Sequence, residues 1–134
     1  MGLFDSLKVC LFSEINGVVM NDGKPVVGAE VTQTAKFSGK FYTYKTATDE
    51  HGRFHFEERR AYSLNKIAPI EPYIDQKIKI SHSGKEYLAW DIDKRNYDSN
   101  GELGRNLKLQ CDLGRKESRK EFGARILWGI CDLQ

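Results

Sequence analysis

Short runs in which apolar and polar residues alternate recur along the chain and predict β-strands. In residues 76–82, Ile78 and Ile80 fall on one side of an extended backbone and lysines fall on the other. Residues 106–113 alternate in the same way, with three leucines and a cysteine on a single side. Because successive side chains of a strand point to opposite faces of its sheet, each run has one face for a core and one for solvent.

Turn-forming residues separate these runs. Asn-Asp-Gly-Lys at 21–24, Ser-Gly at 38–39, Asp-Glu-His-Gly at 49–52 and Ser-Gly at 83–84 supply glycines for the positive φ angles of tight turns. The strands predicted between such turns cover residues 15–20, 29–34, 41–48, 53–57, 76–82, 85–91 and 106–113. The expected fold class is all-β, an antiparallel two-sheet sandwich of about seven to eight strands in a single domain, 1–134.

The two ends of the chain carry weaker patterns. Residues 1–14 predict either a first strand or a short amphipathic lead-in. Residues 114–134 form a polar C-terminal extension, in which the charged segment 115–121 suits a helical turn. For 124–131 a strand is favoured over a helix, because apolar residues alternate there and glycines in or beside the segment weaken a helix.

One motif of about 40 residues is specific enough to suggest a family. Its residues are Gly17, Gly-Lys-Pro-Val at 23–26, Gly-Ala-Glu-Val at 28–31, Thr-Asp at 48–49, Gly52, Phe54 and Phe56. In this order they resemble the carboxypeptidase regulatory-like, or transthyretin-like, β-sandwich family. The resemblance implies a Greek-key sandwich that acts as a rigid, non-catalytic binding or folding unit. Such modules usually accompany a catalytic partner domain, which this chain lacks.

The wider chain also resembles a group of small, stand-alone bacterial proteins that bring no assigned activity with them. The segments that carry this likeness are residues 9–13, 85–90, 100–104 and 129–131.

Charge and hydropathy limit the kinds of partner. The chain has 21 basic and 19 acidic residues, a net charge of +2, which argues against general nucleic-acid binding. No apolar run approaches the roughly 18 residues that a membrane-spanning helix needs, so no membrane span is expected. Asp5 and Lys8 interrupt the apolar start and no cleavage site follows, which predicts a cytoplasmic protein. Periplasmic location or export by another route stays open.

The three cysteines have no spacing typical of a metal or redox motif. Cys10, Cys111 and Cys131 lie far apart in the sequence. One disulfide with one free thiol, or three reduced thiols, both fit. Small buried thiols are the favoured interpretation, because a free cysteine packs like a small apolar residue.

No constellation of catalytic or metal-binding residues stands out. Cys111 falls on the inward side of its strand, where burial makes a thiol inert, and no Gly-x-Ser-x-Gly elbow is present. The spacing of His51, His55 and His82 matches no closed zinc site. The prediction is a non-enzymatic protein with no catalytic residues, no metal and no cofactor.

Two polar loops, residues 58–75 and 92–105, are the predicted contact surface, because loops on a rigid sandwich commonly carry binding. They mix cations with tyrosines, which suits a protein interface or an acidic partner. The candidate binding residues are Arg59, Arg60, Tyr73, Lys94, Arg95 and Tyr97.

The function expected from these observations is a non-enzymatic interaction module with a protein partner. Its size and class suggest an accessory or immunity protein that binds a bacterial toxin or a secretion component. A small-molecule or carbohydrate binder is the alternative, if Tyr42, Tyr44 and Tyr97 form an exposed platform. A small-substrate hydrolase of the transthyretin-like kind is disfavoured, because the chain ends Cys-Asp-Leu-Gln and not Tyr-Arg-Gly-Ser.

Overall fold

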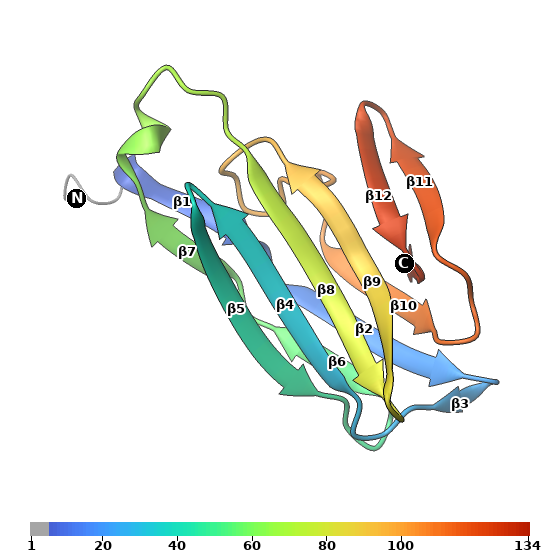
Figure 1. The fold of residues 1–134 in the computed structure, drawn as a ribbon. Coiled ribbons are helices and arrows are strands. Elements are labelled where there is room, and N and C mark those ends of the chain that lie inside the picture. Colours follow the sequence, from blue (N-terminus) through green and yellow to red (C-terminus); the bar gives the residue numbers. More distant parts are fainter. Residues whose placement is uncertain (1–5) are drawn as a thin grey trace.

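The computed structural model describes residues 6–134, which fold almost entirely into strands (Figure 1). The strand segments are β1 (Lys8–Phe12), β2 (Ile15–Asn21), β3 (Lys24–Pro25), β4 (Glu30–Phe37), β5 (Lys40–Ala47), β6 (Arg53–Phe56), β7 (Arg59–Tyr62), β8 (Ile74–His82), β9 (Lys85–Lys94), β10 (Leu107–Asp112), β11 (Ser118–Phe122), β12 (Arg125–Gly129) and β13 (Cys131–Leu133). A short 3-10 helix, η2 (Leu64–Lys66), lies between β7 and β8. The all-β class is confirmed. There are more strand segments than expected, because β3 and β13 have only two and three residues and carry no alternation to detect.

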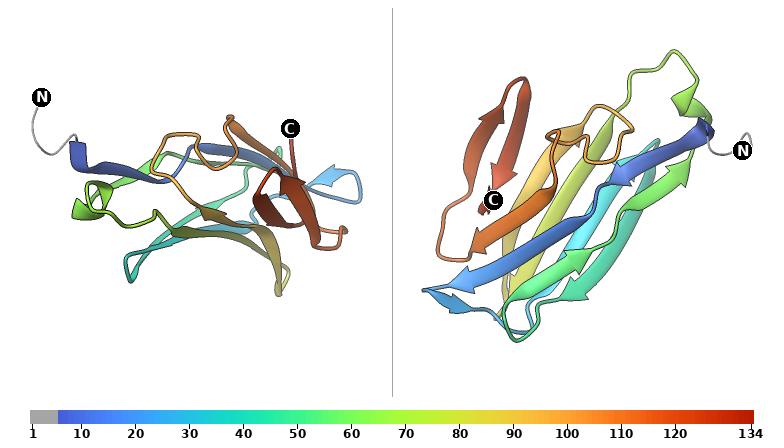
Figure 2. Two further views of the ribbon diagram at one scale, coloured as in Figure 1. Left: turned by 90° about the horizontal axis from the view of Figure 1, so that it is seen from above. Right: turned by 180° about the vertical axis from the view of Figure 1, so that it is seen from behind.

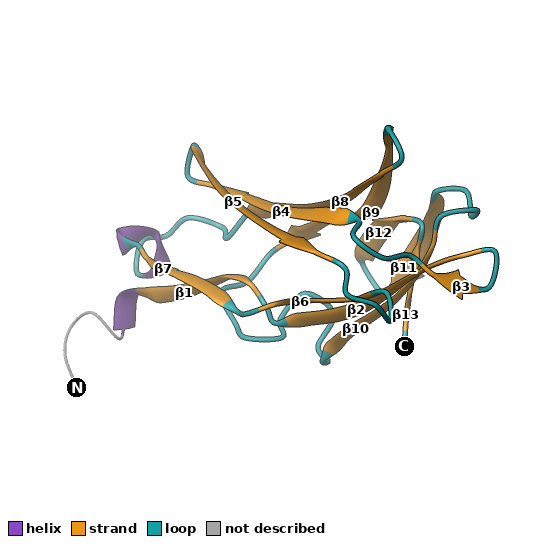
Figure 3. Cartoon of the chain, turned by 90° about the horizontal axis from the view of Figure 1, so that it is seen from below, coloured by secondary structure: helices purple, strands orange, loops and turns teal. Residues whose placement is uncertain are grey.

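The strands form two layers that face each other across one hydrophobic core (Figure 3). One layer is a six-stranded sheet in the order β11-β12-β9-β8-β4-β5. The other contains the sheet β13-β10-β2-β3, in which β6 also pairs with β2. The two-stranded ribbon β1-β7 continues this second layer towards the end of the molecule that carries η2 (Figures 1 and 2).

One strand pair departs from the expected antiparallel arrangement. All pairs in the described residues are antiparallel except β2 and β10, which run parallel, with Ile15 opposite Leu107 and Met20 opposite Asp112. Alternation shows which side of a strand is buried, but it does not show whether two paired strands run parallel or antiparallel. The parallel pairing could therefore not be predicted from the pattern.

The core forms from the inward positions that alternation predicted. Ile78 and Leu107 are buried on facing sheets, together with the indole of Trp90. Gly17 is required in β2 because the ring of Phe54 lies directly over it. A Cβ at Gly17 would stand 2.2 Å from Cζ of that ring.

Two expectations about irregular segments need correction, and a third is confirmed. Residues 59–62, predicted to lie in a loop, form strand β7 and pair with β1. Their charged sequence does not predict a strand, and the strand forms because β1 supplies its hydrogen-bond partners. The helical turn expected at 115–121 is wrong, since residues 118–122 pair with β12 as a hairpin. The strand expected at 124–131 is present as β12 and the start of β13. Together β11 to β13 add strands to both layers.

The cysteines also differ from the favoured interpretation. Cys111 and Cys131 lie opposite each other on β10 and β13 and form a disulfide, with their Cα atoms 4.0 Å apart. Cys10 is free and buried. The pairing depends on the short strand β13, and its position could not be read from sequence spacing.

Candidate functional site

The two predicted loops lie together at the end of the sandwich where β8 begins and β9 ends. Nη1 of Arg95 is 3.2 Å from Oε1 of Glu71, and the guanidinium of Arg95 lies 4.8 Å from the centre of the Tyr73 ring. Ser99 also donates a hydrogen bond to Glu58. These contacts join the segment before β8 to the loop after β9, although about 24 residues separate Glu71 from Arg95.

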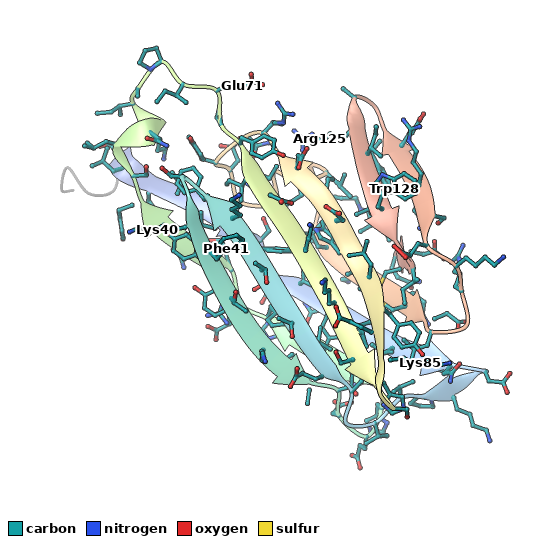
Figure 4. The ribbon with its side chains drawn as sticks, viewed as in Figure 1. Lys40, Phe41, Glu71, Lys85, Arg125 and Trp128 are labelled. Atoms are coloured by element: carbon teal, nitrogen blue, oxygen red, sulfur yellow. A yellow bond between two sulfur atoms is a disulfide. The ribbon has the colours of Figure 1, made fainter. Side chains whose placement is uncertain are left out.

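The same end carries most of the large apolar side chains that the described residues expose. We define the apolar end by six of them: Phe41, Tyr62, Leu64, Ile67, Ile70 and Tyr73. Leu64 and Ile67 are 70% and 66% exposed. Phe41 sits on the β4–β5 hairpin beside Lys40, on the same side as Glu71 in Figure 4. Clustered exposed apolar groups are uncommon on a monomer surface and mark interaction sites.

The backbone beneath the apolar end is firmly held, which explains why its side chains project outwards. Ser63 caps η2, because its Oγ accepts a hydrogen bond from the Asn65 amide at 3.1 Å. The Ser63 amide donates to the Leu7 carbonyl at 2.9 Å, and Lys66 Nζ donates to the Lys8 carbonyl at 2.7 Å. The segment is therefore tied to the start of β1 through one main-chain and one side-chain donor, and its apolar side chains are left outside the core.

A buried polar network supports the other loop. Glu102 is fully buried and its carboxylate accepts three hydrogen bonds: from the Ser13 amide at 2.8 Å, from Ser13 Oγ at 2.6 Å and from Gln76 Nε2 at 2.8 Å. Gln76 Nε2 also donates to the Leu11 carbonyl, and its Oε1 accepts from the Trp90 indole at 3.2 Å. We call Ser13, Gln76, Trp90 and Glu102 the Glu102 network. Burying a carboxylate is costly unless hydrogen bonds such as these replace the water that it loses.

Further contacts fix residues around Glu102 in the loop. The Asn100 amide donates to Ser13 Oγ at 2.7 Å. Arg125 of β12 donates to the carbonyls of Gly101 and Glu102, and its side chain reaches this loop from the neighbouring strand (Figure 4). The loop is thereby bound to β1, β8 and β12 at once.

Lys94 is a correction to the predicted contact surface, because the structure buries it completely. Its Nζ donates to the Asn96 carbonyl at 2.9 Å, to Asn96 Oδ1 at 3.2 Å and to the Asp98 carbonyl at 2.7 Å. Burial lowers the pKa of this ammonium, while the nearby Glu102 carboxylate acts in the opposite direction. Lys94 therefore anchors the loop from inside and presents no charge to a partner.

Two other predicted residues are partly taken up by the fold. The Arg59 guanidinium stacks 3.8 Å from the centre of the Tyr44 ring, and its buried Nε has no hydrogen-bond partner in the protein. The Tyr97 ring meets the edge of Phe37, 5.8 Å between centres. Tyr42, Tyr44 and Tyr97 are partly buried, and all three pack against the core.

Arg60, Arg95 and Tyr73 remain accessible at the surface. Nε of Arg60 lies 3.2 Å from Oε2 of Glu58, with the Arg60 side chain half exposed. The Tyr73 hydroxyl donates to Asp93 at 3.0 Å, and this hydrogen bond raises the pKa of Tyr73. Of the predicted contact set, Tyr73 belongs to the apolar end, and Arg60 and Arg95 lie at its border.

The sequence interpretation missed the apolar residues themselves. Leu64, Ile67 and Ile70 recur at every third position, but Pro69 and Pro72 keep this run too short for a lasting helix. A few apolar residues next to prolines, in a segment between strands, were the available signal. Such residues have no core face to occupy, and exposure is the consequence.

The buried thiol of Cys10 has no features of a nucleophile. Burial raises its pKa to about 11, and its Sγ lies 3.5 Å from Ser13 Oγ. A thiol with this pKa stays protonated at neutral pH. Within residues 6–134 no group of His, Cys, Asp and Glu side chains is arranged to hold a metal ion.

Comparison with known protein families gives one match. Residues 15–116 match a domain of unknown function, DUF6795. The chain belongs to this family. The DUF6795 match runs from the start of β2 to just beyond β10, so it includes both loops of the apolar end and the Glu102 carboxylate. Ser13 and Arg125 contact that loop from outside the matched range: Ser13 lies between β1 and β2, and Arg125 begins β12.

No curated protein matches the sequence of this DUF6795 member. None of the helices in its described part is long and apolar enough to cross a membrane.

Proposed function

We propose that this DUF6795 protein is a non-enzymatic interaction module that binds another protein through the apolar end. The observation that carries the proposal is the exposure of Leu64, Ile67 and Ile70 on a backbone that is tied to β1. Burying each of these side chains against a partner would remove it from water at a gain of roughly 1.5–3 kcal/mol. A held backbone has little conformational entropy left to lose on binding.

The charges around the apolar end favour an acidic partner surface. Residues 36–41 and 58–73, together with Arg95, contain six lysines and arginines and two glutamates. A basic border around an apolar centre is the complement of an apolar patch with an acidic rim, and it would speed association at low ionic strength. The half-buried Arg59 and the surface residues Arg60 and Arg95 belong to this border, and Tyr73 belongs to the apolar centre.

The scaffold role fits the family resemblance of the β2–β6 motif. A transthyretin-like or carboxypeptidase regulatory-like sandwich would hold the two loops in fixed relation, which is the usual use of such modules. A bacterial toxin or a secretion component is the partner class that the size and fold class of this domain suggest. The presence of an effector or secretion gene beside the gene for this protein would support that partner class.

Affinity purification from the native host tests the proposal. The wild-type protein is compared with the double variant Leu64→Glu/Ile67→Glu and with Val27→Glu. Val27 is the matched control, because it is also an exposed apolar residue, 58% exposed, and it follows β3, away from η2 (Figure 1). A protein retained by the wild type and Val27→Glu and lost by the double variant is expected.

The recovered partner is then purified, and its affinity is measured against all three proteins. Two lost apolar anchors at about 2 kcal/mol each, about 4 kcal/mol together, predict an affinity roughly a thousandfold lower for the double variant. Equal binding by the double variant and the wild type would contradict the proposal, as would a partner that Val27→Glu loses instead.

A further inference from the structure

A second surface, on the outer face of β6, β2 and β10, combines a hollow with cations that the fold leaves unused. The hollow has a volume of about 700 Å³. It is lined mainly by residues of these three strands, and Thr46 and Ala47 of β5, Asp49 and Gln134 complete its lining. No other element covers this face in the view from behind (Figure 2). A volume of this size is typical of sites for small organic ligands.

Strand register sets the side chains of the hollow in two rows. Asn16 of β2 lies opposite His55 of β6 and opposite Lys108 of β10, so these three form one row. Val18 lies opposite Arg53 and opposite Gln110, which form the second row. Side chains directly opposite on neighbouring strands are about 5 Å apart at Cβ, so each row is continuous.

The charges in these rows are unbalanced in favour of cations. The guanidinium of Arg53 and the ammonium of Lys108 take part in none of the ion pairs or side-chain hydrogen bonds found in residues 6–134. Asp49 also lines the hollow, and its Oδ1 accepts hydrogen bonds from the main-chain amides of His51 and Arg53 at 2.8 and 2.9 Å. The carboxylate of Glu14, in the neighbouring hollow, pairs with His55 at 2.9 Å.

The neighbouring hollow shows where an anion would not go. It measures about 350 Å³, shares Asn16 and Lys108 with the first, and contains the carboxylates of Glu14 and Glu58. An anionic group is therefore repelled from that side and directed towards Arg53. Val18, only half buried beside Arg53, offers an apolar contact for the rest of a ligand.

We propose that the hollow lined by Arg53 and Lys108 is a binding site for a small organic anion, with a carboxylate or phosphate held between these two side chains. Asn16 and Gln110 supply amide groups for further hydrogen bonds, and Val18 contacts the apolar part of the ligand. The apolar end contributes no residue to this hollow, so the proposal is independent of the protein-binding function.

Titration of the isotope-labelled protein, followed by amide chemical shifts, tests the site. The probes are phenyl phosphate, benzoate and the uncharged benzyl alcohol. Saturable shifts at Asn16, Gly17, Val18, Arg53 and Lys108 with either anion are expected, and none with the alcohol. The more strongly bound anion identifies the acid group that the site prefers.

Charge reversal supplies the control. Arg53→Glu/Lys108→Glu should weaken anion binding at least about tenfold, whereas Lys24→Glu, an exposed cation on β3 of the same sheet, should leave it unchanged. If the double variant does not fold, the salt dependence of the wild type decides. Affinity should fall as ionic strength rises from about 0.01 M to about 0.1 M. Equal binding of benzyl alcohol, shifts that do not saturate, or insensitivity to both charge and salt would each overturn the proposal.

Discussion

Removing the Glu102 carboxylate should destabilise the protein severely and release the loop that borders the apolar end. Glu102→Ala leaves the buried Ser13 amide without its acceptor, and it deletes one of the two acceptors of Gln76 Nε2. It also takes away the carboxylate that opposes the desolvation of Lys94. Breaking a buried, hydrogen-bonded charge arrangement by deleting one partner costs about 3–5 kcal/mol.

This loss is a large part of the free energy of unfolding of the protein. A domain of this kind is stable by about 5–15 kcal/mol, and urea lowers that by about 1–3 kcal/mol per molar. The urea midpoint should therefore fall by roughly 2 M. Trp90 is fully buried and bonded to Gln76, so its fluorescence reports the transition directly. Glu102→Gln preserves the shape and one acceptor oxygen, and it should recover part of the loss.

Glu86→Ala is the matched control for this experiment. Glu86 is an exposed carboxylate with a single ion pair, 3.0 Å from Lys79, and its removal should change stability by no more than about 1 kcal/mol. If Glu102→Ala also unfolds within about 1 kcal/mol of the wild type, the Glu102 network does not anchor the loop and this reasoning is refuted.

Three further outcomes follow from the structure. Cys10 should resist alkylation in the native protein. Mass spectrometry should find one alkylated thiol after unfolding, and three after unfolding and reduction of the Cys111–Cys131 disulfide. Three alkylated thiols in the unfolded protein without reductant would exclude that disulfide. Gly17→Ala should lower the urea midpoint by the equivalent of about 1–3 kcal/mol, because its Cβ meets the Phe54 ring. Two main-chain hydrogen bonds lower the pKa of Asp49, so its contribution is present above the unfolded pKa of about 3.9 and lost as pH falls through the lower native pKa. The stability gap between the wild type and Asp49→Asn should thus be constant near neutral pH and shrink in acid, and a gap that grows in acid would contradict this assignment.

The sequence predicted those parts of the fold in which burial alternates. Ile78 and Leu107 lie inward as expected, and the Ser83-Gly84 turn has both φ angles positive, at 52° and 75°. The pairing of strands that are distant in the sequence was not predicted. The parallel pairing of β2 with β10 and the disulfide to β13 depend on contacts between distant segments, which local periodicity does not encode.

The sequence singled out the two loops of the candidate site, but it did not identify all of the exposed residues in them. The two loops do meet at one end, and Arg95 and Tyr73 contact each other there. Lys94 was misassigned because a buried lysine satisfied by loop carbonyls has the same local sequence as an exposed one. Ile67 was overlooked because exposed apolar residues are recognised only when the fold shows that no core covers them.

Site-specific photocrosslinking in the native host tests the central claim most directly. A benzophenone amino acid replaces Ile67 in one protein and Val27, the exposed apolar residue after β3, in another. The account predicts a discrete protein adduct from position 67 and none from position 27. Lipid adducts, equal labelling at both positions, or no adduct from position 67 would contradict the claim that the apolar end is a protein-binding surface.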